Sequence, residues 1–454
     1  MSIYADDLDP VCGQIASHYE RAGMAEQAIL HYPRAAVVAQ RVYANEDAIS
    51  LLSRGLALLE HVPSGMKRDR QELSLLLALA PTLTVTKGWV APVTEQSLDR
   101  ALALCDKIGD DGQRAQVLNG LQSVYVVQAR LERVQYVAVE LETLYQRSLG
   151  TSPPLFATVM LNGARLHLGH VSEANDRFEE MIAVHDPHQM QRLQEVQGVN
   201  YVVHTRAWQS HALWCLGYPE SALRRGREAV QLARDFEQPF NRALAAAYLA
   251  MLAQLCADEA TATVCAEDAL ALAIEYKAPY YRTWSAILVE YARGWARPDR
   301  EGTARLRESI TAFSIAGAQI RLPYYLSLLA RVLGKAGRAE EGLAVIDEAL
   351  AAARANNERW WDAELHHLRG VLLLAHGAAT SDAEAALLRA LDVARSQRAR
   401  SLELRAAIPL ARLWRSGRHA AEGRRLLADL CDWFTEGQDT PDMVAARALL
   451  AQLG

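Results

Sequence analysis

The chain has 454 residues, of which 51% are hydrophobic and 22% charged, and its formal net charge at pH 7 is −6. A single globular core rarely extends over so many residues, so we expect an array of repeats. The small net charge excludes a strongly basic surface of the kind that binds nucleic acid without regard to sequence. Scattered cysteines, an acidic start without an apolar segment and the absence of any long apolar run predict a cytoplasmic protein without a membrane span.

The first part of the chain is irregular. Over residues 1–80 we expect helix pairs, because Gly23 with Ala28, and Asn45 with Ala48, mark two turns between apolar stretches. Residues 81–92 contain β-branched residues and prolines, which predict a connecting loop. Helix pairs are expected to resume over 93–184. An insertion loop is then predicted at 185–193.

The second part carries a repeat that can be counted from Gly217, where an apolar stretch ends. Steps of forty residues forward, and steps of 48 and then forty back, lead to small or turn-tolerant residues at most positions. We call these the landmark positions: Ala129, Gly169, Gly217, Ala257, Arg297, Gly337, Gly377 and Gly417. Equal consecutive steps indicate structural repeats. The insertion at 185–193 accounts for the longer step.

Two further columns support this register. The residue five after each landmark is small, which lets two antiparallel helices approach closely: Ala174, Ala222, Ala262, Gly302 and Gly342. The residue thirteen after is apolar: Val230, Leu270, Ile310 and Leu350. Both columns slip by one after Gly377, to Ala383 and Leu391. The turn after Gly377 is therefore predicted to hold one extra residue.

The period of about forty exceeds the ~34 residues of an ordinary tetratricopeptide unit by nearly one turn for each helix of a pair. We therefore predict an all-α fold, a right-handed α-solenoid of tetratricopeptide-like antiparallel helix pairs with a period of about 40 residues. The regular repeats are expected over 194–435, and a C-terminal capping helix over 436–454. Helix should exceed about 65% of the chain, with essentially no sheet.

Several stretches carry a family resemblance, among them AGMAEQAILHYPRAA, TKGWVAP, ALWCLGYPESAL, GKAGRAEEGLAVIDEAL and LLADLCDWFTEGQDTPDMVAARALL. They resemble the tetratricopeptide region of bacterial signal-transduction ATPases, such as maltose-regulator-like proteins and multidomain adenylate cyclases. In those regulators a nucleotide-binding domain precedes the array, whereas this chain begins near the first helix pair. The resemblance implies a regulatory module of a bacterial signalling or transcription-regulatory system. Its implied partner is a protein or peptide, with a P-loop ATPase or cyclase domain among the candidates.

Catalytic motifs are absent from the sequence. A P-loop requires G-x-x-x-x-G-K-[ST], and the nearest lysine, Lys335, is followed by Ala336 and has Leu329 where the first glycine should stand. The motifs H-E-x-x-H and G-x-S-x-G do not occur either. We predict that the chain is not an enzyme, that it holds no cofactor and that it does not bind nucleic acid.

Four histidines lie close together in the sequence: His167, His170, His185 and His188. Four imidazoles within a short stretch are a possible set of ligands for a transition metal. The alternative is a polar loop beside an ordinary helix face, which the sequence favours. We therefore predict no metal site.

The candidate partner-binding residues come from the first helix of each pair, which lines the concave wall in tetratricopeptide architecture. The landmark spacing places on that wall His204, His211, Trp214, Trp284, Tyr291, Tyr324, Arg331 and His367. Aromatic and arginine side chains dominate interface hot spots, so the stretch from Trp284 to Arg331 is the preferred site. The alternative is that Trp284 and Tyr324 fill the seam between helix pairs.

Two other functions stay open. The chain could be the separated C-terminal sensory arm of a multidomain ATPase or adenylate cyclase, or a small-molecule sensor with its ligand in the superhelical cavity. The sequence names neither the partner nor the oligomeric state.

Overall fold

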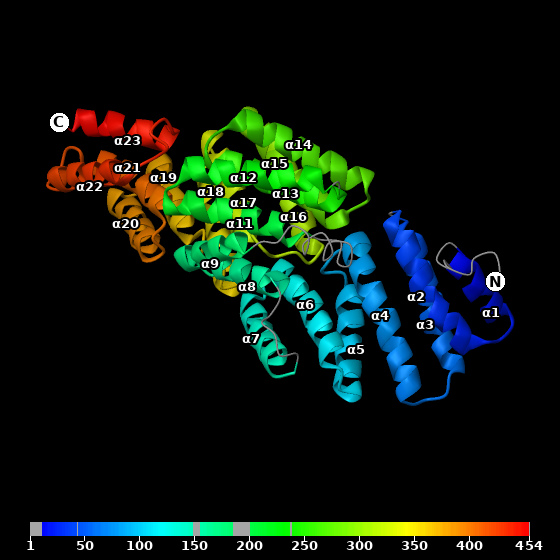
Figure 1. Ribbon diagram of the computed structural model, residues 1–454. Coiled ribbons are helices and arrows are strands. Elements are labelled where there is room, and N and C mark those ends of the chain that lie inside the picture. Colours follow the sequence, from blue (N-terminus) through cyan, green and yellow to red (C-terminus); the bar gives the residue numbers. More distant parts are fainter. Residues whose placement is uncertain (1–10, 43, 149–154, 185–199, 237, 454) are drawn as a thin grey trace. The chain divides into compact units, whose positions relative to one another are not determined.

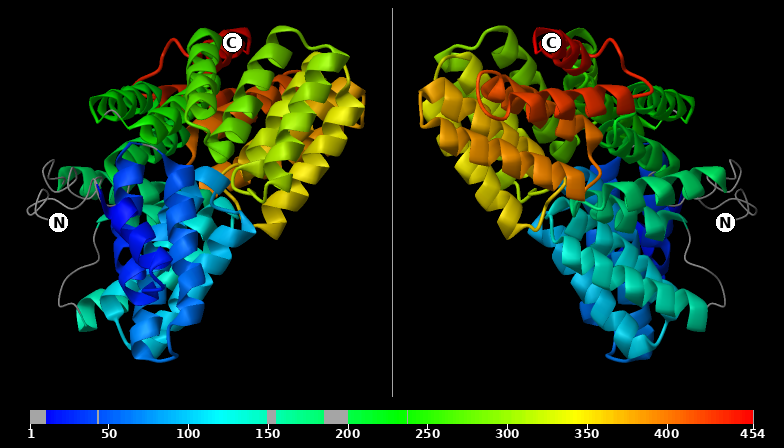
Figure 2. Two further views of the ribbon diagram at one scale, coloured as in Figure 1. Left: turned by 90° about the vertical axis from the view of Figure 1, so that its right-hand side faces the viewer. Right: turned by 90° about the vertical axis from the view of Figure 1, so that its left-hand side faces the viewer.

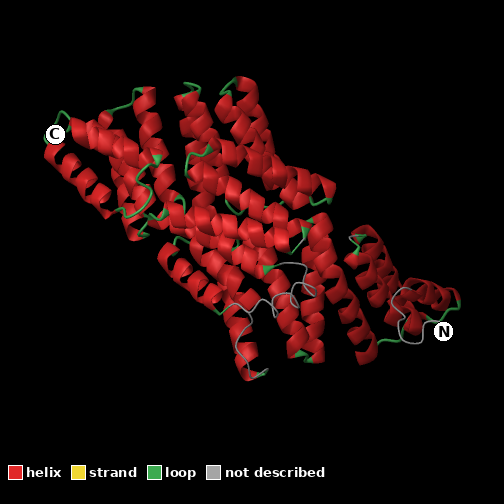
Figure 3. Ribbon diagram, turned by 45° about the horizontal axis from the view of Figure 1, so that its top comes forward, coloured by secondary structure: helices red, strands yellow, loops and turns green. Residues whose placement is uncertain are grey.

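The computed structural model of the chain describes residues 11–42, 44–148, 155–184, 200–236 and 238–453. Every regular element in these ranges is a helix, and no strand occurs among them (Figure 3). This confirms the prediction of an all-α solenoid. The chain divides into two compact units. Unit 1 comprises Met1–Val127, Arg133–Ala157 and Tyr276–Tyr280, and unit 2 comprises Gln128–Glu132, Thr158–Glu275 and Tyr281–Gly454.

Unit 1 contains the N-terminal helices of the chain (Figure 1). They are α1 (Cys12–Arg21), α2 (Ala25–Arg41), α3 (Asn45–Leu58), α4 (Met66–Lys87), α5 (Pro92–Ile108), α6 (Asp111–Val127) and most of α7 (Leu131–Arg147). Successive helices pack on one another because each has an apolar stripe at helical spacing. The stripes of α2, α3 and α4 meet in a core that includes Tyr32, Leu52, Leu75 and Leu79.

The predicted loop at 81–92 is wrong. Helix α4 continues through Pro81 as far as Lys87, and only residues 88–91 separate it from α5. Burial explains the continuation, since apolar residues at steps of three and four run past the proline. Those buried residues are Leu73, Leu76, Ala80 and Leu83.

Two local features make Pro81 tolerable. The hydroxyl of Thr84 donates to the carbonyl of Ala80 at 2.8 Å, and that of Thr86 donates to the carbonyl of Thr82 at 2.7 Å. The helix then ends at Gly88, whose φ of 98° few other residues adopt. Inside the helix, Pro81 cannot donate to the carbonyl of Leu77, at a cost of about 3 kcal/mol, and the burial of the neighbouring leucines outweighs this cost.

Unit 2 continues the array. Its helices are α8 (Leu155–His167), α9 (Val171–Ala183), α11 (Tyr201–Leu216), α12 (Pro219–Asp235), α13 (Pro239–Leu255), α14 (Glu259–Glu275), α15 (Pro279–Ala296), α16 (Arg300–Ile315), α17 (Leu322–Lys335), α18 (Ala339–Ala355), α19 (Asp362–His376), α20 (Thr380–Ser396), α21 (Arg400–Trp414), α22 (Ala420–Trp433) and α23 (Pro441–Gln452). We call α8, α11, α13, α15, α17, α19 and α21 the first helices of their pairs, and α9, α12, α14, α16, α18, α20 and α22 the second helices. The first helices are the more deeply buried: in α13 every residue except Arg242 is buried.

The landmark positions are the turns between first and second helices. Gly169, Gly217, Ala257, Gly337 and Gly377 adopt φ values of 90°, 100°, 58°, 72° and 78°. A residue in this left-handed region reverses the chain after a helix, and glycine does so at least cost. The counted repeat therefore corresponds to real helix ends.

The second helices end in the same way. Lys277, Gly317, Asn357 and Arg398 have φ values of 51°, 92°, 51° and 56°. Their spacing is forty, forty and then forty-one residues, which confirms the extra residue predicted after Gly377. Ala383 is fully buried whereas Asp382 is exposed, as the slipped column requires.

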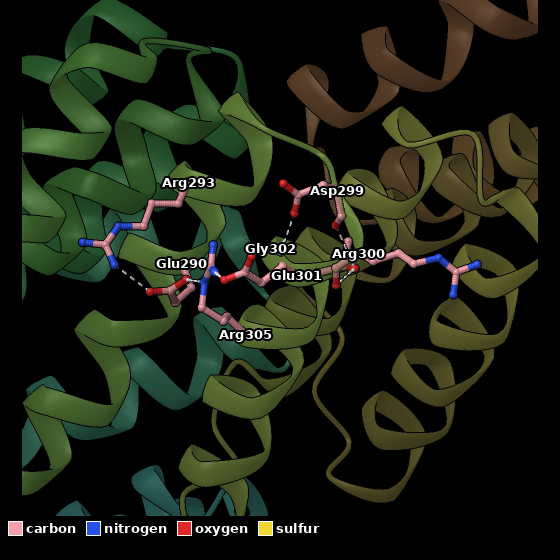
Figure 4. A network of polar contacts seen from close by, with 8 residues as sticks. Glu290, Arg293, Asp299, Arg300, Glu301, Gly302 and Arg305 are labelled. Carbon is pink, nitrogen blue, oxygen red and sulfur yellow. Dashed lines mark hydrogen bonds and ion pairs between the residues drawn. The ribbon is translucent and has the colours of Figure 1, made fainter.

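The turns at Arg297 and Gly417 lack a left-handed residue at the landmark, and at Arg297 a polar network lies across the turn (Figure 4). Asp299 caps α16 by accepting a hydrogen bond from the backbone N–H of Gly302 at 2.7 Å. Glu290 on α15 accepts from Arg293 at 2.8 Å and from Arg305 on α16 at 3.0 Å. The network therefore joins the two helices of this pair across their turn.

Unit 2 closes on itself, because its late helices contact its early ones. Helix α21 packs on α11, and the red and orange C-terminal helices lie beside the green ones in Figure 2. The hydroxyl of Ser401 donates to the carbonyl of Trp214 at 2.6 Å. Glu436 accepts from both the backbone N–H and the hydroxyl of Ser221, each at 2.9 Å. These contacts place the first helices around a common interior.

The structure describes only one of the two segments predicted to flank the regular repeats. The insertion predicted at 185–193 lies outside the described residues. Helix α23 lies within the segment 436–454, and its buried face (Met443, Ala446 and Leu449) joins the core of α21 and α22.

Candidate functional site

Most of the residues predicted for the partner-binding strip are buried. The exposed fraction is 9% for His204, 2% for His211, 3% for Trp214, 1% for Trp284, 5% for Tyr291 and 0% for Tyr324. These six side chains therefore do not form an open strip. The packing alternative accounts for Trp284 and Tyr324. Only Arg331 and His367 are partly exposed, and their role in binding stays a prediction.

Four of these buried residues, His204, His211, Trp284 and Tyr324, lie near Arg321, an arginine that sequence reasoning missed. Its exposed fraction is 3%, and its guanidinium carbon lies 4.3 Å from the ring centroid of Trp284 and 5.1 Å from that of Tyr248. Its Nε donates to the hydroxyl of Tyr325 at 2.9 Å. Cation–π contacts of this kind stabilise a charge that has left water. Three aromatic side chains contact it, namely Tyr248, Trp284 and Tyr325, and the rings of Trp208 and Tyr324 pack on Tyr248 and Tyr325 in turn.

Glu358 supplies the negative charge beside Arg321. Both of its carboxylate oxygens accept from the backbone N–H of Arg321 at 3.0 Å, and Oε1 accepts from the indole N–H of Trp360 at 2.9 Å. Burial raises the pKa of Glu358 to about 7, against the effect of these donors, which favour the charged form.

Three buried histidines lie near this cluster. Burial lowers the pKa of His167 and His204 to about 3 and that of His211 to about 4, and the positive charge of Arg321 adds to the effect. They are therefore neutral at neutral pH. His211 shares a hydrogen bond with the carbonyl of Tyr248 at 3.0 Å, and His167 with that of Gly163 at 2.7 Å.

No group of three or more metal-ligating side chains occurs in the part of the chain that the structure describes. His167 is buried in the interior, where its ring contacts Trp208 and Trp360. His185 and His188 lie outside the described residues.

A second buried cluster surrounds Arg405 on α21. Its guanidinium carbon lies 4.6 Å from the ring centroid of Trp214, its Nε donates to Asp442 at 2.8 Å, and its Nη2 donates to the carbonyl of Leu255 at 2.6 Å. Glu364 lies 3.7 Å from Nη1. Burial acts to raise the pKa of Glu364, but His367 and Arg405 outweigh it and lower the pKa to about 2.

Beside Arg405 the interior has little free space. A cavity of about 30 Å³ lies among residues from α11, α13, α21 and the segment before α23. Such a volume holds about one water molecule. A ligand of drug size needs about 300 Å³ or more. The interior at this point is thus a packed core and no ligand chamber.

The open part of the predicted site lies at the C-terminal ends of α15 and α17. We call Tyr291, Trp295, Arg331 and Lys335 the Trp295 edge. The guanidinium carbon of Arg331 lies 5.3 Å from the ring centroid of Trp295, and Nζ of Lys335 lies 4.1 Å from it. The ring of Tyr291 stacks on that of Trp295 at 6.0 Å.

The polar groups of this edge form few hydrogen bonds and ion pairs with the rest of the protein. Lys335 donates to the carbonyl of Trp295 at 2.7 Å, and the indole N–H of Trp295 donates to Glu259. Among the described residues, the side chain of Arg331 makes neither a hydrogen bond nor an ion pair. The sequence offered a signal for the missed members, because Trp295 follows Tyr291, and Lys335 follows Arg331, by four residues on the same helix face.

The chain was compared with known proteins. No family model matches it. An uncharacterized protein of Rhizobium meliloti (strain 1021) is 37% identical over 118 residues, which are 25% of this chain and 11% of that protein. The match thus spans a small part of the relative's length.

The fold is similar to solved structures at low sequence identity. A Rap protein complexed with competence and sporulation factor is 11% identical, with 94% of this chain and 98% of that chain covered and a TM-score of 0.44. A signal-transduction ATPase with a tetratricopeptide repeat sensor, from Pyrococcus horikoshii, is 12% identical, with 86% and 57% covered and a TM-score of 0.41. Aspartyl phosphate phosphatase F from Bacillus subtilis is 13% identical, with 90% and 94% covered and a TM-score of 0.39.

Scores this low do not establish a shared function. The tetratricopeptide-like solenoid rests on the helix pairs and their columns of small residues. Within the described residues no helix has the length and apolar character needed to cross a membrane.

Proposed function

We propose that the chain is a non-catalytic protein-interaction module that binds a segment of a partner protein at the Trp295 edge. The observation that carries the proposal is the position of Arg331, partly exposed and unpaired among the described residues, over the face of Trp295. A cation held against an aromatic ring presents charge, apolar area and hydrogen-bond donors together. Tryptophan and arginine are the residues most enriched at interface hot spots.

The closed interior supports this choice. The tryptophans and tyrosines that sequence reasoning placed on the wall are already packed against Arg321 and Arg405, so a partner segment would have to displace a core to reach them. The Trp295 edge needs no such change. With Arg331 and Lys335 there, an acidic side chain or a terminal carboxylate of the partner is the complementary group.

The biological setting belongs to the same proposal. The resemblance to arrays in bacterial signal-transduction ATPases favours a signalling or transcription-regulatory role, with an ATPase or cyclase domain as one candidate partner. The reading as a separated sensory arm predicts the same edge but a partner from the same operon. The small-molecule sensor gains no support from the cavity beside Arg405.

Site-specific photo-crosslinking tests the location. A photoreactive amino acid replaces Lys335, and, in a control, Glu308 on the outer side of α16, which is also exposed. In native-host extract the Lys335 position should crosslink one protein at least several-fold more strongly than the Glu308 position. Equal or stronger crosslinking at Glu308 would move the interface to the outer helices.

A further inference from the structure

A second open site, separate from the Trp295 edge, lies along α19. An open surface depression of about 440 Å³ lies between α18, α19 and α20. Its lining residues are Leu350, His366, Arg369, Leu373, Asp382, Ala385, Ala386 and Arg389. We call it the α19 groove. On α19, His366 and Arg369 point away from the side on which Glu364 meets Arg405, because two residues turn a helix by about half a revolution.

The positive charges near this groove all act on the imidazole of His366. Burial lowers the pKa of His366 to about 4, and the positive charges of Arg389, Arg369 and Arg354 reinforce the effect. Three arginines on three successive helices therefore lie near enough to act on a ring that is neutral at neutral pH. Its ring can still donate one hydrogen bond.

The positive charges of Arg354, Arg369 and Arg389 are only partly neutralised by acidic side chains. Arg369 forms an ion pair with Asp347, and Asp382 lies at the other end of the groove. Burial raises the pKa of Asp362, against the positive charges of Arg359 and of Arg389 and Arg354. Within the described residues, the side chains of Arg354 and Arg389 make neither an ion pair nor a hydrogen bond.

The rest of the lining is apolar. Leu350 and Ala386 are each 8% exposed, and Leu373 is half-buried. The depression combines an apolar lining with a few polar side chains, as small-molecule sites do. Arginine is the residue best suited to hold phosphate or carboxylate groups by paired hydrogen bonds.

We propose that the α19 groove binds a small organic anion, whose phosphate or carboxylate groups lie between Arg369 and Arg389 and accept a hydrogen bond from His366. The apolar part of the ligand would contact Leu350 and Leu373. This site is separate from the Trp295 edge, so either proposal can fail without the other.

Histidine-labelled protein, followed by NMR during titration with pyrophosphate and, separately, with citrate, tests the proposal. His366→Gln identifies the His366 signal. With at least one anion that signal should shift saturably, and its pKa should rise, because the bound negative charge favours the imidazolium. The anion that binds more tightly shows whether phosphate or carboxylate is preferred.

Two variants make the test specific. Arg369→Ala with Arg389→Ala should weaken the better anion at least tenfold, whereas Arg424→Ala with Arg425→Ala, exposed on α22, removes the same charge elsewhere and should leave its affinity unchanged. If the first double variant does not fold, Arg389→Ala alone, at an exposed position, replaces it. No saturable shift with either anion at concentrations on the order of 10 mM, or equal weakening by both double variants, overturns the proposal.

Discussion

The guanidinium of Arg405 on α21 lies over the indole ring of Trp214 on α11, 4.6 Å from its centroid. The two helices belong to pairs far apart in the sequence, and the same guanidinium donates to the carbonyl of Leu255 at the end of α13. One arginine thus joins three helix pairs of unit 2. This closure is why the first helices are buried, and it is the reason that we propose their ends as the partner site.

Arg405→Ala tests the closure. The change leaves Glu364 buried with only His367 and Arg331 as positive neighbours, and breaking a buried ion pair in this way costs about 3–5 kcal/mol. Urea unfolding should show this loss in the free energy of unfolding. Arg405→Met with Glu364→Gln removes both charges and should recover much of it. A single variant as stable as the parent would mean that the contact contributes nothing.

The column of small residues predicts that a larger side chain destabilises the fold at a buried position but not at an exposed one. Ala222 on α12 is fully buried, so Ala222→Leu should overpack the contact with the neighbouring helix and cost about 1–3 kcal/mol. Ala271 on α14 is exposed, and Ala271→Leu should change stability by less than about 0.5 kcal/mol. Thermal unfolding compares them. Equal melting temperatures for both variants and the parent would invalidate the helix register.

Backbone conformation at the landmarks gives a stabilising substitution. Ala257 has a φ of 58°, a conformation that costs a non-glycine residue about 1–2 kcal/mol. Ala257→Gly should therefore raise the free energy of unfolding by about 0.5–1 kcal/mol after the entropy of glycine is subtracted. Gly217→Ala, at a φ of 100°, should have the opposite sign. Chemical denaturation measures both, and a destabilised Ala257→Gly variant would contradict the account.

The buried histidines predict that acid weakens the fold. The pKa of His167, His204 and His211 is lower in the folded chain than the ordinary 6.5. Between about pH 3 and pH 6.5 the unfolded chain therefore binds more protons, and stability falls as the pH drops below 6.5. The slope reaches about 1.4 kcal/mol per pH unit for each histidine.

Glu358 acts in the opposite sense. Its pKa is raised from 4.5 to about 7, so it contributes stability at low pH that is lost as the pH rises through 7. Three histidines outweigh this one carboxyl group below pH 6.5. His204→Phe keeps an aromatic ring against Trp208. It should reduce the dependence of the free energy of unfolding on pH, below pH 6.5, by up to about 1.4 kcal/mol per pH unit, which is the contribution of one histidine. An unchanged slope in this variant would show that His204 is not a buried neutral group.

Local features of the fold could be predicted from the sequence. The small residues at Ala222, Ala262 and Ala383 and the one-residue slip after Gly377 are set by contacts within a helix pair, which recur at a constant period. Pro81 misled the prediction because its local cost is small beside the burial of Leu79 and Leu83 on the same helix.

The candidate site could be predicted only in part. The positions of Trp284 and Tyr324 on first helices follow from the repeat, but their burial does not. Tyr324 donates to Gln254, two helix pairs earlier, and Arg321 donates to Tyr248. Such contacts depend on how the whole array curves, and no local spacing encodes that.

The affinity of the crosslinked partner for Arg331→Ala with Lys335→Ala tests the central claim most directly. Both side chains are at least partly exposed, so the melting temperature should change by only a few degrees. The dissociation constant should rise at least tenfold, while Arg424→Ala with Arg425→Ala leaves it unchanged. Unchanged affinity in the Arg331 and Lys335 variant, or an equal loss in both double variants, would contradict binding at the Trp295 edge.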